Sequence, residues 1–271
     1  MSEIIRQHTE GASIAIALEH GARLASLKIG GKELLVTQSD DFLPESPIAD
    51  DPMAWGSYLM APWAGRVREG RFIWNGRKVE LPLTMPPHAI HGTVYNEPWT
   101  QINEASFSRE FGPDWPWKGR IRSDFKLEPG SLQWTCTVEA EEPMPITLGW
   151  HPWFKRAIDD QGLASFDFQP GKMYQRDPTG IPTGQLVSPS RGPWDDCFTE
   201  LKSKPRITWP CGLVLELSSS CEHWVVYDER DYAFCIEPQS APPDAFNLGP
   251  TQVASPGAPL VHQMTLEWFQ D

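Results

Sequence analysis

Cysteine is scarce in this chain of 271 residues, which contains only Cys136, Cys197, Cys211, Cys221 and Cys235. Their number is odd, and no two of them form a Cys-x-x-Cys pair. The sequence therefore indicates neither a disulfide framework nor a zinc site, and no bound metal is expected. We expect reduced thiols that are mostly buried, as free cysteines usually are.

Long apolar runs and basic clusters are also missing. No stretch approaches the roughly 18 apolar residues of a membrane-spanning helix, and the first residues lack the basic start and apolar run of a signal peptide. We therefore expect a cytoplasmic protein with no membrane partner. Lys and Arg number 23 against 36 Asp and Glu, which gives a formal net charge of −13. Such a surface repels phosphate backbones, so we expect no nucleic-acid partner and favour a small neutral ligand.

No long segment carries an uninterrupted helical pattern, because 21 glycines and 27 prolines punctuate the chain at short intervals. This punctuation favours many short strands. Large apolar residues recur at every second position in three segments: "SIAIALE" (13–19), "SLQWTCTVEA" (131–140) and "LVLEL" (213–217). Each pattern predicts a strand with one buried face.

Two short glycine-containing pairs predict hairpin turns. Asn75-Gly76 lies between strand-like runs in "RFIWNGRKVEL", and Gly30-Gly31 lies between such runs in "KIGGKELL". The Pro-rich segments near 43–62, 176–193 and 238–259 are interpreted as connections. With no internal repeat and no clear linker, we expect a single domain spanning 1–271 with an all-β fold, a large antiparallel β-sandwich.

Three residues are candidates for acid and base chemistry. His91 lies in "MPPHAIHGTVYN", His151 in "LGWHPWF", and Glu237 in "FCIEPQSAPPDAFN", after an apolar, strand-like run. If they converge, a carboxylate and a histidine can move protons between two oxygens and open a cyclic hemiacetal without a metal or cofactor. Taken alone, each has a structural interpretation as a hydrogen-bonded core histidine or a solvated glutamate.

The aromatic residues around His151 divide by strand alternation. A regular strand places His151 and Trp153 on one face and Trp150 and Phe154 on the other. We expect the first pair to face a cavity, where the Trp153 ring would pack against the apolar face of a sugar, and the second pair to lie in the core.

Five segments, in order, resemble those of the aldose 1-epimerases, the sugar mutarotases. "APWAGRVREGRF" is similar to the family's Pro-Trp-x-Asn-Arg segment, "HAIHG" to its Leu-His-Gly, and "WHPWF" to its His-(Pro/Ser)-Tyr-Phe. "DDCF" resembles its Asp-x-x-Phe, and "EPQSAPPDAFN" its Glu-x-Gln followed by Pro-Asp-Ala-x-Asn. The resemblance covers most of the chain and implies the galactose mutarotase-like β-sandwich.

The resemblance also implies roles for individual residues. Glu237 would be the general base on the anomeric hydroxyl, His151 the general acid on the ring oxygen, and His91 a group that binds and polarises the same region. Sugar hydroxyls would be held by Arg66 and Asp195, and Trp153 would form a wall for the ring. The implied reaction interconverts the α and β anomers of a free aldose, with a monosaccharide as partner and no cofactor.

The chain departs from the family pattern at three positions: Gly65 replaces the usual Asn, Thr93 a second Gly, and Trp153 a Tyr. These departures concern the choice of substrate more than the acid and base. Asp244 is interpreted as a brace for a loop that carries Glu237. Without the resemblance, Asp195 and Asp196 could equally form a turn or capping pair.

Two alternative functions stay open. Clustered Arg66, Arg68 and Arg71 could bind the phosphate of a hexose phosphate, or could form a solvated strand face. A non-catalytic sugar-binding protein is the other alternative. The preferred aldose and the oligomeric state are not fixed by the sequence.

Overall fold

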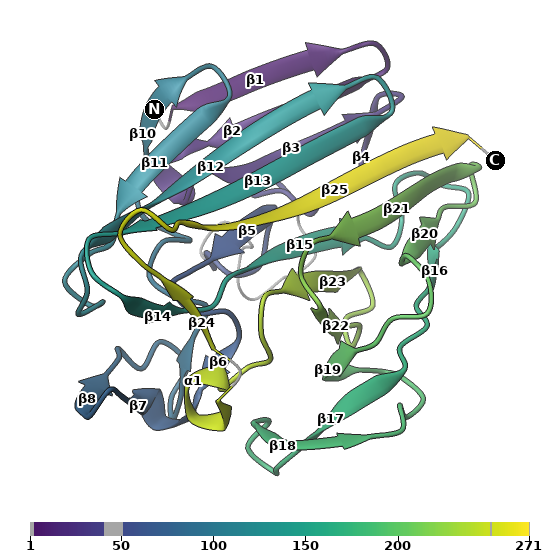
Figure 1. Cartoon of the computed structure of the whole chain (residues 1–271). Coiled ribbons are helices and arrows are strands. Elements are labelled where there is room, and N and C mark those ends of the chain that lie inside the picture. Colours follow the sequence, from purple (N-terminus) through teal and green to yellow (C-terminus); the bar gives the residue numbers. More distant parts are fainter. Residues whose placement is uncertain (1–2, 41–50, 250, 271) are drawn as a thin grey trace.

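The computed structural model describes residues 3–40, 51–249 and 251–270, which fold almost entirely into antiparallel β-sheets (Figure 1). In these residues the larger sheet has the order β1-β2-β3-β5-β15-β23-β22-β19-β17-β18, with β4 paired to β3. Its strands are β1 (Ile4–Thr9), β2 (Ala12–Ala17), β3 (Arg23–Ile29), β4 (Lys32–Glu33), β5 (Ser57–Met60), β15 (Gly149–Lys155), β17 (Lys172–Arg176), β18 (Pro182–Val187), β19 (Asp195–Thr199), β22 (His223–Tyr227) and β23 (Ala233–Gln239).

The second sheet has the order β10-β11-β12-β13-β25-β21-β20-β16. Its strands are β10 (Thr100–Asn103), β11 (Ser106–Glu110), β12 (Gly119–Glu128), β13 (Ser131–Ala140), β16 (Ser165–Asp167), β20 (Arg206–Thr208), β21 (Leu213–Ser219) and β25 (Leu260–Gln270).

Three two-stranded sheets and short helical turns complete the described structure. The sheets pair β6 (Arg66–Val67) with β9 (Ala89–Ile90), β7 (Arg71–Trp74) with β8 (Arg77–Glu80), and β14 (Met144–Ile146) with β24 (Gln252–Ala254). The α-helix α1 (Ala245–Leu248) lies beside β6 and β7 (Figure 1). Two 3₁₀ turns are η1 (Leu18–His20) and η3 (Arg68–Gly70).

The two large sheets share one hydrophobic core, which makes the fold a β-sandwich. Trp134 on β13 and Trp150 on β15 meet edge to face across the sheets, with ring centroids 6.3 Å apart. Leu59 and Phe154 lie in the same core and are completely buried. The core therefore takes one face of β5 and β15 and leaves the other face for a different use.

The local predictions are confirmed where alternation or a turn determines the structure. β13 coincides with the segment 131–140, and its apolar set Leu132, Trp134, Cys136 and Val138 is buried. Asn75-Gly76 joins β7 to β8, and Gly30-Gly31 joins β3 to β4. Each of the five cysteines is a free thiol, and four are buried, with Cys211 partly exposed.

Two predictions were wrong in detail. The Pro-rich segments contain regular structure, because β5, β18, α1 and β24 fall inside them. Residues 43–50 of the first segment and residue 250 of the third lie outside the described residues. Glu237 does not follow the strand but lies within β23, which continues to Gln239. A proline is tolerated in β23 and in β15, although it removes a hydrogen-bond donor from each strand.

No helix of the described ranges is long and apolar enough to cross a membrane.

We expect Leu59→Ala to lower the free energy of unfolding by about 2–5 kcal/mol, because it leaves a cavity in a close-packed core. Leu163→Ala is the matched control: Leu163 is 64% exposed, whereas Leu59 is fully buried. Urea denaturation of both variants measures the difference. Equal losses for the two leucines would contradict the position of the core.

Candidate functional site

The pairing of β15 with β23 places His151 opposite Glu237. Gly149 pairs with Gln239, and Trp153 pairs with Cys235. His151 lies midway between the two β15 residues and Glu237 midway between the two β23 residues, so they face each other. The Nε2 atom of His151 lies 3.3 Å from Oε1 of Glu237, and both side chains are buried. Directly opposed residues of an antiparallel pair are close enough for such a contact.

Two aromatic side chains, Trp153 and Tyr58, contact the His151 ring. Trp153 lies on the same strand face, with ring centroids 5.4 Å apart, as alternation predicts, while Trp150 and Phe154 are in the core. Tyr58 on β5, which pairs with His151 across the sheet, stacks on the His151 ring with centroids 4.7 Å apart. The stack fixes the orientation of the imidazole, and Trp153 is held in turn by its Nε1, which donates to the Met53 carbonyl oxygen at 2.6 Å.

His91 reaches the same place from a strained turn. Its φ is +61°, in the left-handed region that few residues other than glycine adopt. The next residue, Gly92, packs against Ala61, the residue after β5, so closely that a Cβ would lie 1.9 Å from the Ala61 carbonyl oxygen. The His91 ring meets the His151 ring edge to face at 5.0 Å. Neither His91 Nδ1 nor His151 Nδ1 has a hydrogen-bond partner among the described residues, although both atoms are buried.

These side chains line a cavity of about 360 Å³, a size typical of small-molecule sites. Its lining contains all six residues singled out from the sequence: Arg66, His91, His151, Trp153, Asp195 and Glu237. The structure thus brings together residues from β6, β15, β19 and β23 and from the loop after β9.

Arg66 and Asp195 form a polar pair at this cavity. Arg66 Nη2 lies 3.5 Å from Asp195 Oδ2, and Arg176 Nη1 donates to the same oxygen at 3.0 Å. Asp195 and Asp196 are the first residues of β19, so the interpretation of this pair as a turn is wrong. An arginine and a carboxylate side by side offer both donors and acceptors to a hydroxyl-rich ligand.

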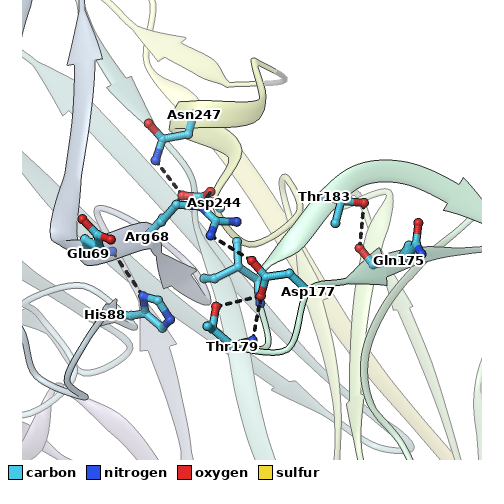
Figure 2. Close-up of polar contacts among 10 residues, drawn as sticks. Arg68, Glu69, His88, Gln175, Asp177, Thr179, Thr183, Asp244 and Asn247 are labelled. Carbon is cyan, nitrogen blue, oxygen red and sulfur yellow. Dashed lines mark hydrogen bonds and ion pairs between the residues drawn. The ribbon is translucent and has the colours of Figure 1, made fainter.

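Arg68 and Arg71 have other partners. Arg68 Nη1 donates to Asp177 Oδ2 at 2.8 Å, and its backbone N–H donates to Asp244 Oδ1 at 2.9 Å (Figure 2). Arg71 pairs with the exposed Glu80 within the β7–β8 hairpin. Neither arginine lines the cavity of Glu237.

Asp244 braces the loop after β23, and not a loop that carries Glu237, because Glu237 lies within the strand. One of its carboxylate oxygens accepts from both the Arg68 backbone and the Asn247 side chain (Figure 2). Its own N–H donates to the Arg66 carbonyl oxygen at 2.7 Å. The loop is therefore joined to the strand that carries Arg66.

Gln239 is a site residue that the sequence reasoning passed over. It is completely buried, lines the cavity, and donates from Nε2 to Glu237 Oε2 at 3.2 Å. Its Oε1 has no partner among the described residues. The signal was available, because residues two apart on a strand share a face. Tyr58 was missed because its segment was interpreted as a connection.

Burial controls the charges of the site. It raises the pKa of the Glu237 carboxyl well above its usual range, and the neighbouring Asp195 raises that pKa further. It lowers the pKa of His151 to about 3, and it lowers the pKa of His91 well below its usual value. A single proton shared by Glu237 and His151 therefore rests on Glu237 in the free protein.

A buried arginine adds to this effect. Arg23 is fully buried, lies over the Trp55 and Tyr58 rings, and donates to the carbonyl oxygens of His20, Trp55 and Tyr95. Its positive charge lies behind Tyr58 and further lowers the pKa of His151.

One set of residues could hold a metal ion. Ligand atoms of His151, Cys235 and Glu237 lie within 4.8 Å of one another, and all three side chains are buried. No motif or spacing in the sequence groups Cys235 with His151 and Glu237. A cation bound there would coordinate the same atoms through which His151 and Glu237 contact each other. Burial raises the pKa of the Cys235 thiol well above its usual value, which disfavours the thiolate that would bind the cation.

Gly65 lines the cavity without contributing a side chain. Its φ is +66°, and a Cβ at this position would lie 2.7 Å from Pro243 Cγ. The space that a larger residue would need is filled by the loop that Asp244 braces.

Comparisons with known proteins agree on one family. The model of the family described as aldose 1-epimerase matches residues 3–267. The uncharacterized protein YphB of Escherichia coli (strain K12) is 24% identical over 246 residues, which cover 78% of this chain and 84% of YphB.

Solved structures share the fold. A galactose mutarotase-like protein from Clostridium acetobutylicum superposes with a TM-score of 0.85 at 17% identity, covering 100% of this chain and 96% of its own. A galactose 1-epimerase from Lactobacillus acidophilus NCFM superposes with a TM-score of 0.78 at 14% identity, covering 97% and 93%. The expected galactose mutarotase-like β-sandwich is confirmed.

We expect Gly65→Asn to lower the free energy of unfolding by about 1–3 kcal/mol, because its Cβ overlaps Pro243 and the tightly packed loop must shift. Gly76→Asn separates this overlap from backbone strain, since Gly76 also has a positive φ of +80° but nothing within 4 Å of a Cβ. Urea denaturation compares the two. If Gly76→Asn is as destabilising, the overlap with Pro243 is not the cause.

Proposed function

Because the chain belongs to the aldose 1-epimerase family, we propose that it is a mutarotase that interconverts the α and β anomers of a free aldose. The single observation that supports this most is the 3.3 Å contact between His151 Nε2 and Glu237 Oε1. In a pyranose the anomeric oxygen O1 and the ring oxygen O5 are bonded to the same carbon. An acid and a base that act on these two oxygens must therefore be close neighbours, as these two groups are.

The reaction begins with a sugar between the two groups. Glu237 removes the proton of the O1 hydroxyl, the C1–O5 bond breaks, and His151 gives a proton to O5. The product is the open-chain aldehyde. Rotation about the C1–C2 bond presents the other face of the carbonyl group. His151 then takes the proton back from the O5 hydroxyl as O5 attacks C1, and Glu237 returns a proton to O1.

The pair holds one proton throughout this cycle. With the ring closed, the proton is on His151 and Glu237 is ionised; with the ring open, it is on Glu237 and His151 is neutral. The burial that raises the pKa of Glu237 and lowers that of His151 favours the second arrangement in the free protein. Before the ring opens, the shared proton must therefore move to His151, at a cost in free energy that is recovered when the O1 proton transfers to Glu237.

The remaining residues bind and orient the sugar. His91, whose burial favours the neutral imidazole, contacts the same region and polarises it. Arg66 and Asp195 hold ring hydroxyls, and the Trp153 ring packs against the C–H face. Gln239 donates to Glu237 and so directs the other carboxylate oxygen toward O1.

A phosphorylated substrate has less support. That alternative relied on Arg66, Arg68 and Arg71 acting together, but Arg68 is paired with Asp177 and Asp244, and Arg71 with Glu80. Anomer exchange measured with a free hexose and its phosphate ester separates the two functions, and acceleration of the ester alone would overturn the free-sugar proposal.

Removing the base or the acid tests the proposal directly. We expect Glu237→Gln and His151→Asn to lower kcat by about 100-fold or more, the usual contribution of a positioned acid or base, while sugar binding falls much less. Glu229→Gln, an exposed glutamate lining the same cavity, is the control and should keep its activity. Decay of the optical rotation of fresh α-glucose and α-galactose, followed by a wider aldose panel, measures the rate.

The outcome also separates catalysis from binding. If no sugar of the panel relaxes faster with the wild-type protein than with buffer or with Glu237→Gln, the protein is not a mutarotase, and the sugar-binding alternative stands.

The pH dependence of kcat/KM should be bell-shaped, with the maximum where the pair holds one proton. The acid limb reports a second proton on His151, whose pKa is lowered, so activity should persist below the ordinary histidine value of about 6.5. The alkaline limb reports loss of the last proton and lies above the ordinary pKa of Glu237, because that pKa is raised. Polarimetry corrected for buffer catalysis gives the profile; an acid limb centred at or above the ordinary histidine value would contradict the assignment.

A further inference from the structure

The thiol of Cys235 takes no part in the function proposed above, although it lies beside the acid and base. Cys235 pairs with Trp153 of β15 on one side and with Tyr227 of β22 on the other. The rings of these two neighbours meet edge to face, with centroids 5.8 Å apart. Cys235 is completely buried and belongs to the same cluster as Tyr58 and Trp153. Its side chain therefore lies on the face of the sheet that carries His151.

Strand geometry brings this thiol to the acid and base. Cys235 lies two residues before Glu237 on β23, so the two side chains share a face. His151 is directly opposite Glu237 and therefore diagonal to Cys235. Cys235 Sγ, a ring nitrogen of His151 and a carboxylate oxygen of Glu237 lie within 4.8 Å of one another. A sulfur, a nitrogen and an oxygen thus converge on one buried point.

The spacing of these three atoms is close to that of a zinc site. Bonds of about 2.0–2.3 Å directed to the corners of a tetrahedron put neighbouring ligand atoms roughly 3.3–3.8 Å apart. His151 Nε2 and Glu237 Oε1 are already 3.3 Å apart, and Cys235 Sγ needs to move by only about 1 Å. Three protein ligands leave one position of a four-coordinate zinc ion for a water molecule.

The charges of this cluster also suit a dication. Metal binding takes Cys235 as the thiolate, Glu237 as the carboxylate and His151 as the neutral imidazole, which gives two negative charges. Burial raises the pKa of both Cys235 and Glu237 and so disfavours each anion alone. A dication makes the buried cluster neutral, because it replaces the thiol proton and the proton that Glu237 shares with His151.

Neighbouring contacts hold two of the three ligands in place. Gln239 Nε2 donates to Glu237 Oε2, which leaves Oε1 for an ion, and the Tyr58 ring stacks on His151. Contacts that orient the ligands in this way strengthen metal binding. An ion can enter through the cavity, because His151 and Glu237 both line it.

The kinds of donor atom select among cations. Mg²⁺ and Ca²⁺ prefer shells of six or more oxygen atoms, and of the three side chains only Glu237 offers oxygen. Sulfur and imidazole nitrogen are ligands that suit Zn²⁺. The cluster therefore favours zinc over the hard cations.

We propose that His151, Cys235 and Glu237 form a binding site for Zn²⁺, and that the bound ion inhibits the protein. Zinc at this site coordinates the nitrogen and the oxygen that must exchange protons with O5 and O1, so the sugar ring cannot open. The inhibition rests on the proposed function, whereas the binding of zinc does not.

Binding is measured first, by competition with a chromophoric chelator on protein that EDTA has stripped of metal. We expect one Zn²⁺ per chain, which an excess of Mg²⁺ does not displace. Cys235→Ala and Cys235→Ser should each weaken zinc binding about 100-fold or more, because loss of a direct ligand costs at least as much as loss of a contact that orients one.

Cys221→Ala is the matched control. Cys221 is also a buried thiol beside a histidine, with Sγ 3.6 Å from His262 Nδ1, but no third metal-ligating side chain joins this pair among the described residues. The zinc affinity of Cys221→Ala should equal that of the wild-type protein.

Thermal unfolding checks that each variant is folded. If neither variant of Cys235 folds, X-ray absorption by the zinc complex of Cys221→Ala decides. The proposed site predicts one sulfur at about 2.3 Å from the zinc, with nitrogen and oxygen at about 2.0–2.2 Å. A zinc ion without a sulfur neighbour would overturn the site.

Polarimetry then compares the rate of each protein with zinc against its own rate with EDTA. Zinc should abolish the acceleration by the wild-type protein and by Cys221→Ala, and EDTA should restore it. The variants of Cys235 should need about 100-fold more zinc for the same loss of rate.

The outcomes separate the two proposals. If the wild-type protein binds no zinc, or if the variants of Cys235 bind it as tightly, the site is overturned and the mutarotase proposal stands. If zinc binds through Cys235 without lowering the rate, the inhibition is overturned. If the wild-type protein accelerates no sugar even with EDTA, the proposed function fails, and the binding measurement still decides the zinc site.

Discussion

The pairing of β15 with β23 is the constraint on which the site depends. It places His151 opposite Glu237, and because the side-chain period of a strand is two, a shift by one residue would turn one of them into the core. That shift is opposed by the other face of the same strands, where Trp150, Phe154 and Phe234 fill the space between the sheets. The stability of the sandwich and the geometry of the acid and base are therefore maintained by the same register.

Burial then determines the electrostatics. His151 lies beneath Tyr58 and beside Trp153, with the buried Arg23 behind Tyr58. This environment disfavours the imidazolium, while it also disfavours the Glu237 carboxylate. The two shifts together favour the neutral pair, with the shared proton on Glu237, over the ion pair with the proton on His151. The aromatic surroundings of His151 thus affect its proton affinity as well as the packing of a sugar ring.

The sequence predicts those features that are local. Alternation in "WHPWF" is sufficient to place His151 and Trp153 on one face, and Asn75-Gly76 is sufficient for the β7–β8 hairpin. Which strand lies beside β15 is not local, so the contact with Glu237 follows only from the family resemblance or from the structure. Tyr58 escapes prediction because the prolines around it suggest a connection, although β5 pairs with β15 in the middle of the sheet. The partners of Arg68 are set by tertiary packing and have no signature in the sequence.

The contact between Gly65 and Pro243 couples two distant positions of the chain. Gly65 lies just before β6, whereas Pro243 belongs to the loop after β23. The Pro243 ring fills the space that a side chain at position 65 would occupy. A homologous chain with asparagine at position 65 must therefore displace that loop or carry a smaller residue at position 243. The shape of this side of the sugar cavity is therefore set by the two positions jointly, and a larger residue at position 65 changes the position of the loop as well as the lining of the cavity.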